Sequence, residues 1–188
     1  MILPAPVFTP VLGEDSGQRI DRVVRSFAGC SLSTRRDDLA ALVGRGVDDE
    51  SMVTWETNCL VFAIGIIAAC GSDVVELREH IPNGREYVAL NPLVKRAGGW
   101  ELFSGQPVKT GSLMHYRSVP YRVNTAGETV YDDHYEFKLL ASDEHGGGGR
   151  VNNEITVEHG DWSHSVGRPL YEVLDPDGYG LPDANAAV

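Results

Sequence analysis

The chain has 188 residues, 42% of them hydrophobic, which is enough for one domain with a sizeable core. Its formal net charge of -11 argues against a nucleic-acid or anionic-membrane surface, because those partners favour clustered lysine and arginine. Three cysteines without CxxC or Cys/His spacing are too few for a disulfide scaffold and are not typical of a zinc site. We therefore expect a single domain over residues 1–188, with reduced thiols, no metal and no cofactor.

The N-terminal stretch "MILPAPVFTPVLGEDSG" is not typical of a signal peptide, because prolines interrupt it and no basic region precedes its apolar residues. The longest apolar run, "CLVFAIGIIAACG", is shorter than the roughly 20 residues needed to cross a bilayer. We expect no membrane insertion and synthesis in the cytoplasm, with any export using a route other than a signal peptide. The oligomeric state stays open.

The first part of the chain predicts helices. Residues 1–17 lack periodicity and are expected to form an extended arm. The next segment, "QRIDRVVRSFAG", has helical spacing of its apolar residues and ends on Gly29, a typical C-cap. Residues 31–47, "SLSTRRDDLAALVGRGV", predict a second short helix with Ser33 or Thr34 as its N-cap.

A third helix is predicted in "TNCLVFAIGIIAACG", beginning near Thr57 or Asn58 and ending before Gly71. Apolar residues cover all of its sides, which is typical of a central, buried helix. Cys59 lies in its first turn, where the helix N-terminus stabilises a thiolate, the form of cysteine that attacks carbonyl carbon. Cys59 is therefore a candidate nucleophile, and the alternative is a structural buried thiol.

The other two cysteines are expected to be part of the core. Cys70 lies at the C-terminal end of the same predicted helix, where the helix dipole disfavours a thiolate. Cys30 has no feature that suggests reactivity.

The second part of the chain predicts strands. Residues 112–123, 134–142 and 152–160 alternate apolar and polar side chains with β-favouring residues. "SDEHGGGGR", between the last two, predicts a hairpin with a flexible tip, and "PLYEVL" at 169–174 predicts one helical turn. Helices followed by an antiparallel sheet indicate the α+β class.

A cysteine nucleophile needs a base within hydrogen-bond reach, and the base needs a third group that orients it. His134 begins a predicted strand and therefore lies at the end of the sheet, where it can face the tip of a packed helix. His115 lies inside a strand and His145 in the predicted loop, so both are worse placed. His134 is the predicted base.

The predicted hairpin also supplies the third group. If its tip lies near Gly146, His134 falls opposite Val157, and His159 is the nearest polar residue at the correct end. We predict that His159 orients the ring of His134. A shift in register across the glycine-rich loop would replace His159 by one of three neighbours, Asn152, Asn153 or Glu154.

Four segments in this order, "TNCLVFAIGIIAACG", "TGSLMHY", "DHYEFKLL" and "NNEITVEHG", resemble the core of papain-like hydrolases of the NlpC type. The cysteine, histidine-dependent amidohydrolases/peptidases are a related group. The resemblance covers residues 55–160, and it implies a papain-like fold in which N-terminal helices and a central buried helix pack on an antiparallel sheet. "TGSLMHY" lacks the family's proline and aspartate, and Glu136 replaces a small residue of the family's histidine motif.

The resemblance implies acyl transfer to Cys59, with His134 as base and His159 as third residue. Family members mostly cut peptide bonds in bacterial peptidoglycan, so we expect a bacterial or phage peptidase or amidase with a peptide substrate. Trp55 and Asn58, beside the nucleophile, are the expected substrate contacts, because aromatic faces bind sugars and peptides. The alternatives are a catalytically inactive binding protein with the same fold and an intracellular amidase or peptidase.

Overall fold

The computed structural model describes residues 9–29, 58–72, 100–123, 127, 129–148, 155–165 and 167–185. These ranges contain helices and an antiparallel sheet, so the α+β class is confirmed. The predicted helix at 31–47 and Cys30 lie outside the described residues. The elements are α1 (Ser16–Phe27), α3 (Asn58–Ala69), β1 (Trp100–Leu102), β2 (Leu113–Val123), β3 (Thr129–Lys138), β4 (Glu144–Gly148), β5 (Ile155–His159), β6 (His164–Ser165), β7 (Arg168–Leu174) and the 3-10 helix η3 (Pro176–Tyr179).

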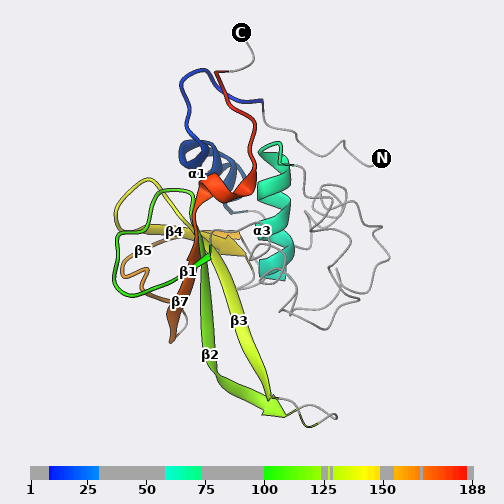
Figure 1. The fold of residues 1–188 in the computed structure, drawn as a ribbon, viewed down its shortest axis with the longest axis vertical. Helices are drawn as coiled ribbons and strands as arrows, with labels where there is room; N and C mark the ends of the chain where they lie inside the picture. Colours follow the sequence, from blue (N-terminus) through cyan, green and yellow to red (C-terminus); the bar gives the residue numbers. More distant parts are fainter. Residues whose placement is uncertain are drawn as a thin grey trace.

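The strands form one antiparallel sheet in the order β1-β7-β2-β3-β4-β5, and β6 pairs with β7. Strands β2 to β5 are therefore adjacent in chain order, and β7 returns to insert between β1 and β2. In Figure 1, β2 and β3 extend as a long hairpin away from α1 and α3, which lie together at the opposite end of the molecule.

Helix α1 begins with a capping box in which the Asp15 side chain accepts from the backbone N–H of Gln18 and the Gln18 side chain accepts from that of Asp15. The capping box starts the helix at Ser16, inside the expected arm. The helix ends at Phe27, and Gly29 follows with φ 77°, as the sequence predicts for a helix end. The buried apolar face of α1 consists of Ile20, Val23, Val24 and Phe27.

Helix α3 packs against α1 and against strands β3 and β4. Its buried side chains include Phe62, Ile66 and Ile67, which join the core formed by α1 and the sheet. The all-round apolar sequence thus matches a helix enclosed by α1 and the sheet. The Arg19 guanidinium of α1 donates to the carbonyl oxygen of Cys70 at 3.2 Å, which fixes the C-terminal end of α3 against α1.

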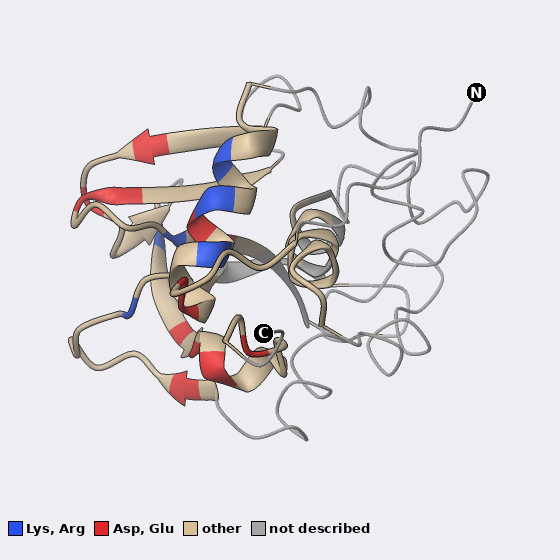
Figure 2. Cartoon of the chain, turned by 90° about the horizontal axis from the view of Figure 1, so that it is seen from above, with Lys and Arg blue, Asp and Glu red and all other residues tan. Residues whose placement is uncertain are grey.

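Charged residues of α1 connect the helix to its surroundings. Figure 2 shows basic residues grouped along α1 and acidic residues spread over the strands. Arg22 is paired with Glu14 at 2.7 Å, and Arg25 is paired with Asp21 at 2.8 Å and with Glu144 of β4. Within the described ranges, no helix has the length and hydropathy required to cross a bilayer.

Two predicted elements differ from the structure. Strand β3 begins at Thr129, so His134 lies within the strand and does not open it, because the preceding residues pair with the long strand β2. The segment 169–174, predicted as a helical turn, belongs to strand β7. Its neighbours β1 and β2 supply backbone partners on both sides, and this pairing overrides the local helical spacing.

The glycine-rich segment, predicted as a flexible hairpin tip, is the buried strand β4 between β3 and β5. Glycine is required there because neighbours approach closely. A Cβ on Gly146 would lie 2.8 Å from Cγ1 of Val24, and a Cβ on Gly147 would lie 2.7 Å from Cγ of Glu136. The β3–β4 turn is formed instead by residues 139–143.

Candidate active site

Cys59 is the second residue of α3 and has a free thiol with 7% of its surface exposed. The first backbone N–H groups of a helix have no intrahelical acceptor, and together with the helix dipole they favour an anion at this position. Cys70 at the other end of α3 is fully buried, and burial raises the pKa of its thiol to about 12 despite nearby Arg19 and Arg22. Cys70 is thus part of the core, as predicted.

His134 and Glu136 are two residues apart on β3, so their side chains share one face of the strand. Nε2 of His134 lies 2.8 Å from Oε1 of Glu136. Cys59 and Glu136 are the two groups that raise the pKa of His134, so Cys59 is its second polar neighbour. The thiol, the imidazole and the carboxylate therefore gather at one place in the fold.

This arrangement favours the charged forms of His134 and Glu136. Burial by itself lowers the pKa of His134, but hydrogen bonds to Cys59 and Glu136 outweigh it and raise the pKa to about 9. Burial opposes ionisation of Glu136 as well, yet hydrogen bonds from His134 and His145 hold its pKa well below the usual range. At neutral pH, His134 is an imidazolium held beside the Glu136 carboxylate.

Glu136 accepts two further hydrogen bonds. Ser165 Oγ of β6 donates to Oε1 at 3.0 Å, and Nδ1 of His145 on β4 lies 2.5 Å from Oε2. Glu136 is only 2% exposed, and Gly147 opposite it on β4 leaves the space that its side chain fills. Both carboxylate oxygens are thus engaged, which restricts rotation of the group that faces His134.

The structure does not place His159 beside His134. Strand β5 pairs with β4 and not with β3, so His159 lies opposite Glu144. Its side chain is 65% exposed, and its ring nitrogens lie 3.8 Å from Asp143 and 3.5 Å from Glu144. The prediction that His159 orients His134 is therefore wrong, and Glu136 occupies that position. Trp55, the side chain of Asn58, and the alternatives Asn152, Asn153 and Glu154 lie outside what the structure describes.

The spacing of His134 and Glu136 is a sequence signal for the third group. A histidine and a glutamate at positions i and i+2 of a strand project to the same face and can hydrogen-bond directly. His145 has no such local signal, because "HGGGG" has the composition of a loop, and only pairing on both sides makes the segment a strand.

Comparison of the chain with protein-family models, curated proteins and solved structures finds no match in any of the three. Among the described residues, no group of histidine, cysteine, aspartate and glutamate side chains is arranged to hold a metal ion. The candidate site is therefore inferred from the geometry of its own residues.

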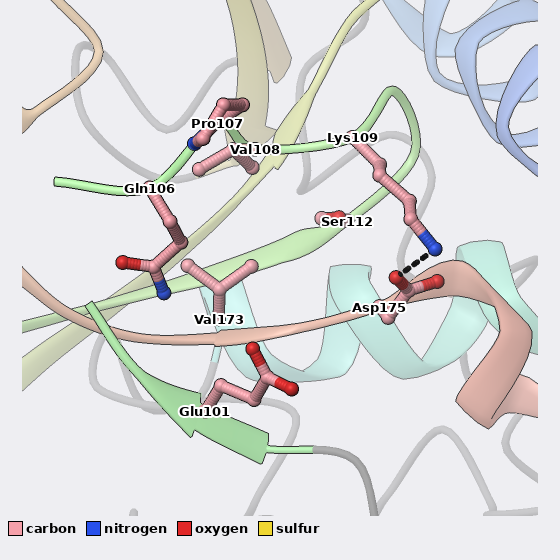
Figure 3. Close-up of a pocket in the computed structure, with 8 residues that line it drawn as sticks. All are labelled: Glu101, Gln106, Pro107, Val108, Lys109, Ser112, Val173 and Asp175. Atoms are coloured by element: carbon pink, nitrogen blue, oxygen red, sulfur yellow. Dashed lines mark ion pairs between the residues drawn. The ribbon is translucent and has the colours of Figure 1, made fainter. Parts of the chain in front are cut away.

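A hollow of about 250 Å³ lies beside β1 and β7 (Figure 3). Its wall includes the ion pair between Lys109 and Asp175, whose charged atoms are 2.5 Å apart. The residues that line it are Glu101, Gln106, Pro107, Val108, Lys109, Ser112, Val173 and Asp175. Cys59, His134 and Glu136 are not among them, so this hollow is not the candidate active site.

Proposed function

We propose that the protein is a cysteine hydrolase with a papain-like mechanism, a peptidase or amidase that cleaves an amide bond through Cys59. His134 is the general base and acid, and Glu136 orients its ring. The observation that carries the proposal is the buried imidazole of His134, which lies 2.8 Å from the Glu136 carboxylate and has its pKa raised by Cys59 and Glu136 together. A nucleophile, a base and an orienting carboxylate in this order are the requirements of thiol acyl transfer.

The reaction follows from these roles. The Cys59 thiolate attacks the amide carbonyl carbon, and the carbonyl π electrons move to oxygen. His134 then gives its proton to the departing amine nitrogen as the C–N bond breaks, which leaves a thioester on Cys59. Water attacks the thioester while His134 accepts its proton, and cleavage of the C–S bond releases the acid and restores the thiolate.

Backbone N–H groups at the start of α3, including that of Cys59, are the proposed donors to the oxyanion. Such a donor contributes about 3 kcal/mol to stabilisation of the transition state in other enzymes.

The proposed substrate class is peptide, with bacterial peptidoglycan favoured. This choice rests on the resemblance of residues 55–160 to NlpC-type hydrolases, which also suggests a bacterial or phage origin. Trp55 and Asn58 remain the proposed substrate contacts, because they precede and begin the helix that carries Cys59. Synthesis in the cytoplasm, followed by delivery without a signal peptide, is part of the same proposal.

The test is alkylation of the folded protein with iodoacetamide over a range of pH, with the modified cysteine located by mass spectrometry. We expect Cys59 to react and Cys70 to stay unmodified, because Cys70 is fully buried and its thiol has a raised pKa. Peptidoglycan fragments are then incubated with the wild type, with Cys59→Ala and with Cys70→Ala as a matched control. Loss of cleavage in Cys59→Ala alone supports the proposal, and equal cleavage by Cys59→Ala and wild type refutes it.

One observation favours a second function. Cys59 and His134 are only 7% and 5% exposed, which also suits a binding protein that keeps the fold without the chemistry. The alkylation experiment separates the two functions. A binding protein leaves Cys59 unmodified until the chain unfolds, whereas a hydrolase exposes it to a small reagent in the native state.

A further inference from the structure

We propose that His145 is a positioning residue for the reaction of Cys59. Its Nδ1–H donates to Oε2 of Glu136 and holds the carboxylate with Oε1 directed at His134. This inference rests on the proposed function, because it assigns the residue that keeps the third member of the site in place.

Both carboxylate oxygens of Glu136 have hydrogen-bond partners. Oε1 serves both His134, at 2.8 Å, and Ser165, at 3.0 Å. Oε2 has His145 at 2.5 Å, the shortest of these contacts. A carboxylate held at one oxygen only is free to turn about its last bond, and its other oxygen would lose a hydrogen bond in a buried environment. The hydrogen bond from His145 prevents both this rotation and the loss of a partner for Oε2.

The direction of the hydrogen bond fixes the form of His145. Glu136 is ionised, since the pKa of its carboxyl is held far below the usual range, and an ionised carboxylate only accepts. Nδ1 of His145 must therefore carry the hydrogen. This requirement holds for the neutral ring with its hydrogen on Nδ1 and for the imidazolium.

The backbone keeps His145 in this position. On β4 it lies opposite Lys138 of β3 and Glu158 of β5, so strands on both sides fix its place. Nζ of Lys138 donates to the carbonyl oxygens of Leu139 and Ala141 in the β3–β4 turn and of Glu144 at the start of β4. The charged and titratable groups around the ring of His145 are Glu136, His134, Lys138 and Glu158, with Cys59 reached through His134.

The effect on chemistry passes through His134. A fixed carboxylate stabilises the imidazolium, and the imidazolium stabilises the thiolate of Cys59. Without the His145 donor, the Glu136 carboxylate stabilises the imidazolium of His134 less. The thiolate of Cys59 then forms only at higher pH. A purely structural role would lower stability and leave the pH profile of the remaining folded protein unchanged.

The test compares the rate of Cys59 alkylation against pH in the full chain for His145→Ala and His145→Asn. The side-chain amide nitrogen of asparagine occupies the position of Nδ1 in histidine, so it restores the donor without an ionisable ring. We expect the pH of half-maximal rate to rise by about one unit in His145→Ala, the scale of one charge-assisted hydrogen bond. His145→Asn is expected to return it to within a few tenths of a unit of wild type.

The matched control is Glu144→Gln, which changes the neighbouring buried residue on β4 and weakens its ion pair with Arg25 without touching Glu136. This variant should leave the pH of half-maximal Cys59 alkylation unchanged. If His145→Ala does not fold, His145→Gln replaces it, because its amide reaches the position of Nε2 and not that of Nδ1. We expect the same upward shift.

The outcomes separate this inference from the proposed function. Unreactive Cys59 in the folded wild type refutes the proposed function itself. Reactive Cys59 with the same midpoint in wild type and His145→Ala, or in wild type and His145→Gln, refutes only the role of His145. Equal shifts in His145→Ala and His145→Asn also refute the positioning role, because a donor at Nδ1 would then have no effect.

Discussion

Glu136→Gln is the substitution that tests the core of the candidate site. The change removes one charge and keeps the size of the side chain. With its oxygen placed toward His134, the new amide group points its N–H₂ at Nδ1 of His145, which is also a donor. The variant therefore loses both the partner of the imidazolium and one buried hydrogen bond.

The magnitude follows from the pKa of His134. Its rise from the usual 6.5 to about 9 corresponds to about 3 kcal/mol in favour of the imidazolium, after burial has opposed it. Cys59 and Glu136 are the two partners that produce this rise, and loss of one hydrogen bond to a charged group costs about 2 kcal/mol. If the same free energy is lost from the transition state, activity falls roughly 30-fold. The mismatched donor adds a cost of about 1–3 kcal/mol in the free energy of unfolding.

The assay is a ¹⁵N NMR titration of the histidine side chains in wild type and Glu136→Gln. We expect the pKa of His134 to fall by about one to two units in the variant. His159→Ala is the matched substitution, because its side chain is 65% exposed and should leave cleavage unchanged. If His134 titrates at the same pH with and without Glu136, the electrostatic reasoning is refuted.

The same pKa predicts how stability depends on pH. The folded-state pKa of His134 is above its unfolded value, so its contribution to the free energy of unfolding is fully present below about pH 6.5 and is lost as pH rises through about 9. Urea denaturation between pH 6 and 10 should show this fall in the wild type and a smaller fall in Glu136→Gln. Equal slopes for the two proteins would contradict it.

Two further substitutions test the packing around the site. Gly147→Ala places a Cβ 2.7 Å from Cγ of Glu136 and 3.0 Å from the carbonyl oxygen of Tyr135, so we expect a loss of about 1–3 kcal/mol in unfolding free energy and a lower rate of Cys59 alkylation. Gly127→Ala strains a backbone with φ 81° but meets no atom within 4 Å, so it should lower stability while leaving that alkylation rate unchanged. Asp15→Ala removes the cap of α1 and should cost about 1 kcal/mol by urea denaturation, without moving the pH profile of alkylation.

Local patterns predicted the elements whose conformation depends on nearby residues. The buried helix α3, with Cys59 in its first turn, follows from a continuous apolar run between polar residues and Gly71. The strand at β2 follows from alternation. The α+β class follows from the order of these segments, and the pairing of Cys59 with His134 was inferred from the chemistry that a thiol nucleophile requires.

The failed predictions all involve pairing between distant segments. The prediction for His159 depends on a hairpin between the predicted strands 134–142 and 152–160, but β4 inserts between β3 and β5. Glycine has low intrinsic preference for strands, so "EHGGG" gave no local signal for this insertion. Only the approach of Val24 on one face and of Glu136 on the other shows why glycine is needed there.

The sequence by itself determined which residues carry reactive groups and placed the thiol at a helix N-terminus, because capping and hydrophobic periodicity are local properties of the chain. The tertiary structure decided which side chains surround His134. Sheet order is a collective result of backbone pairing over many residues, and it brought Glu136, His145 and Ser165 together while leaving His159 exposed. A difference of one strand in that order selects a different third residue for the same proposed nucleophile and base.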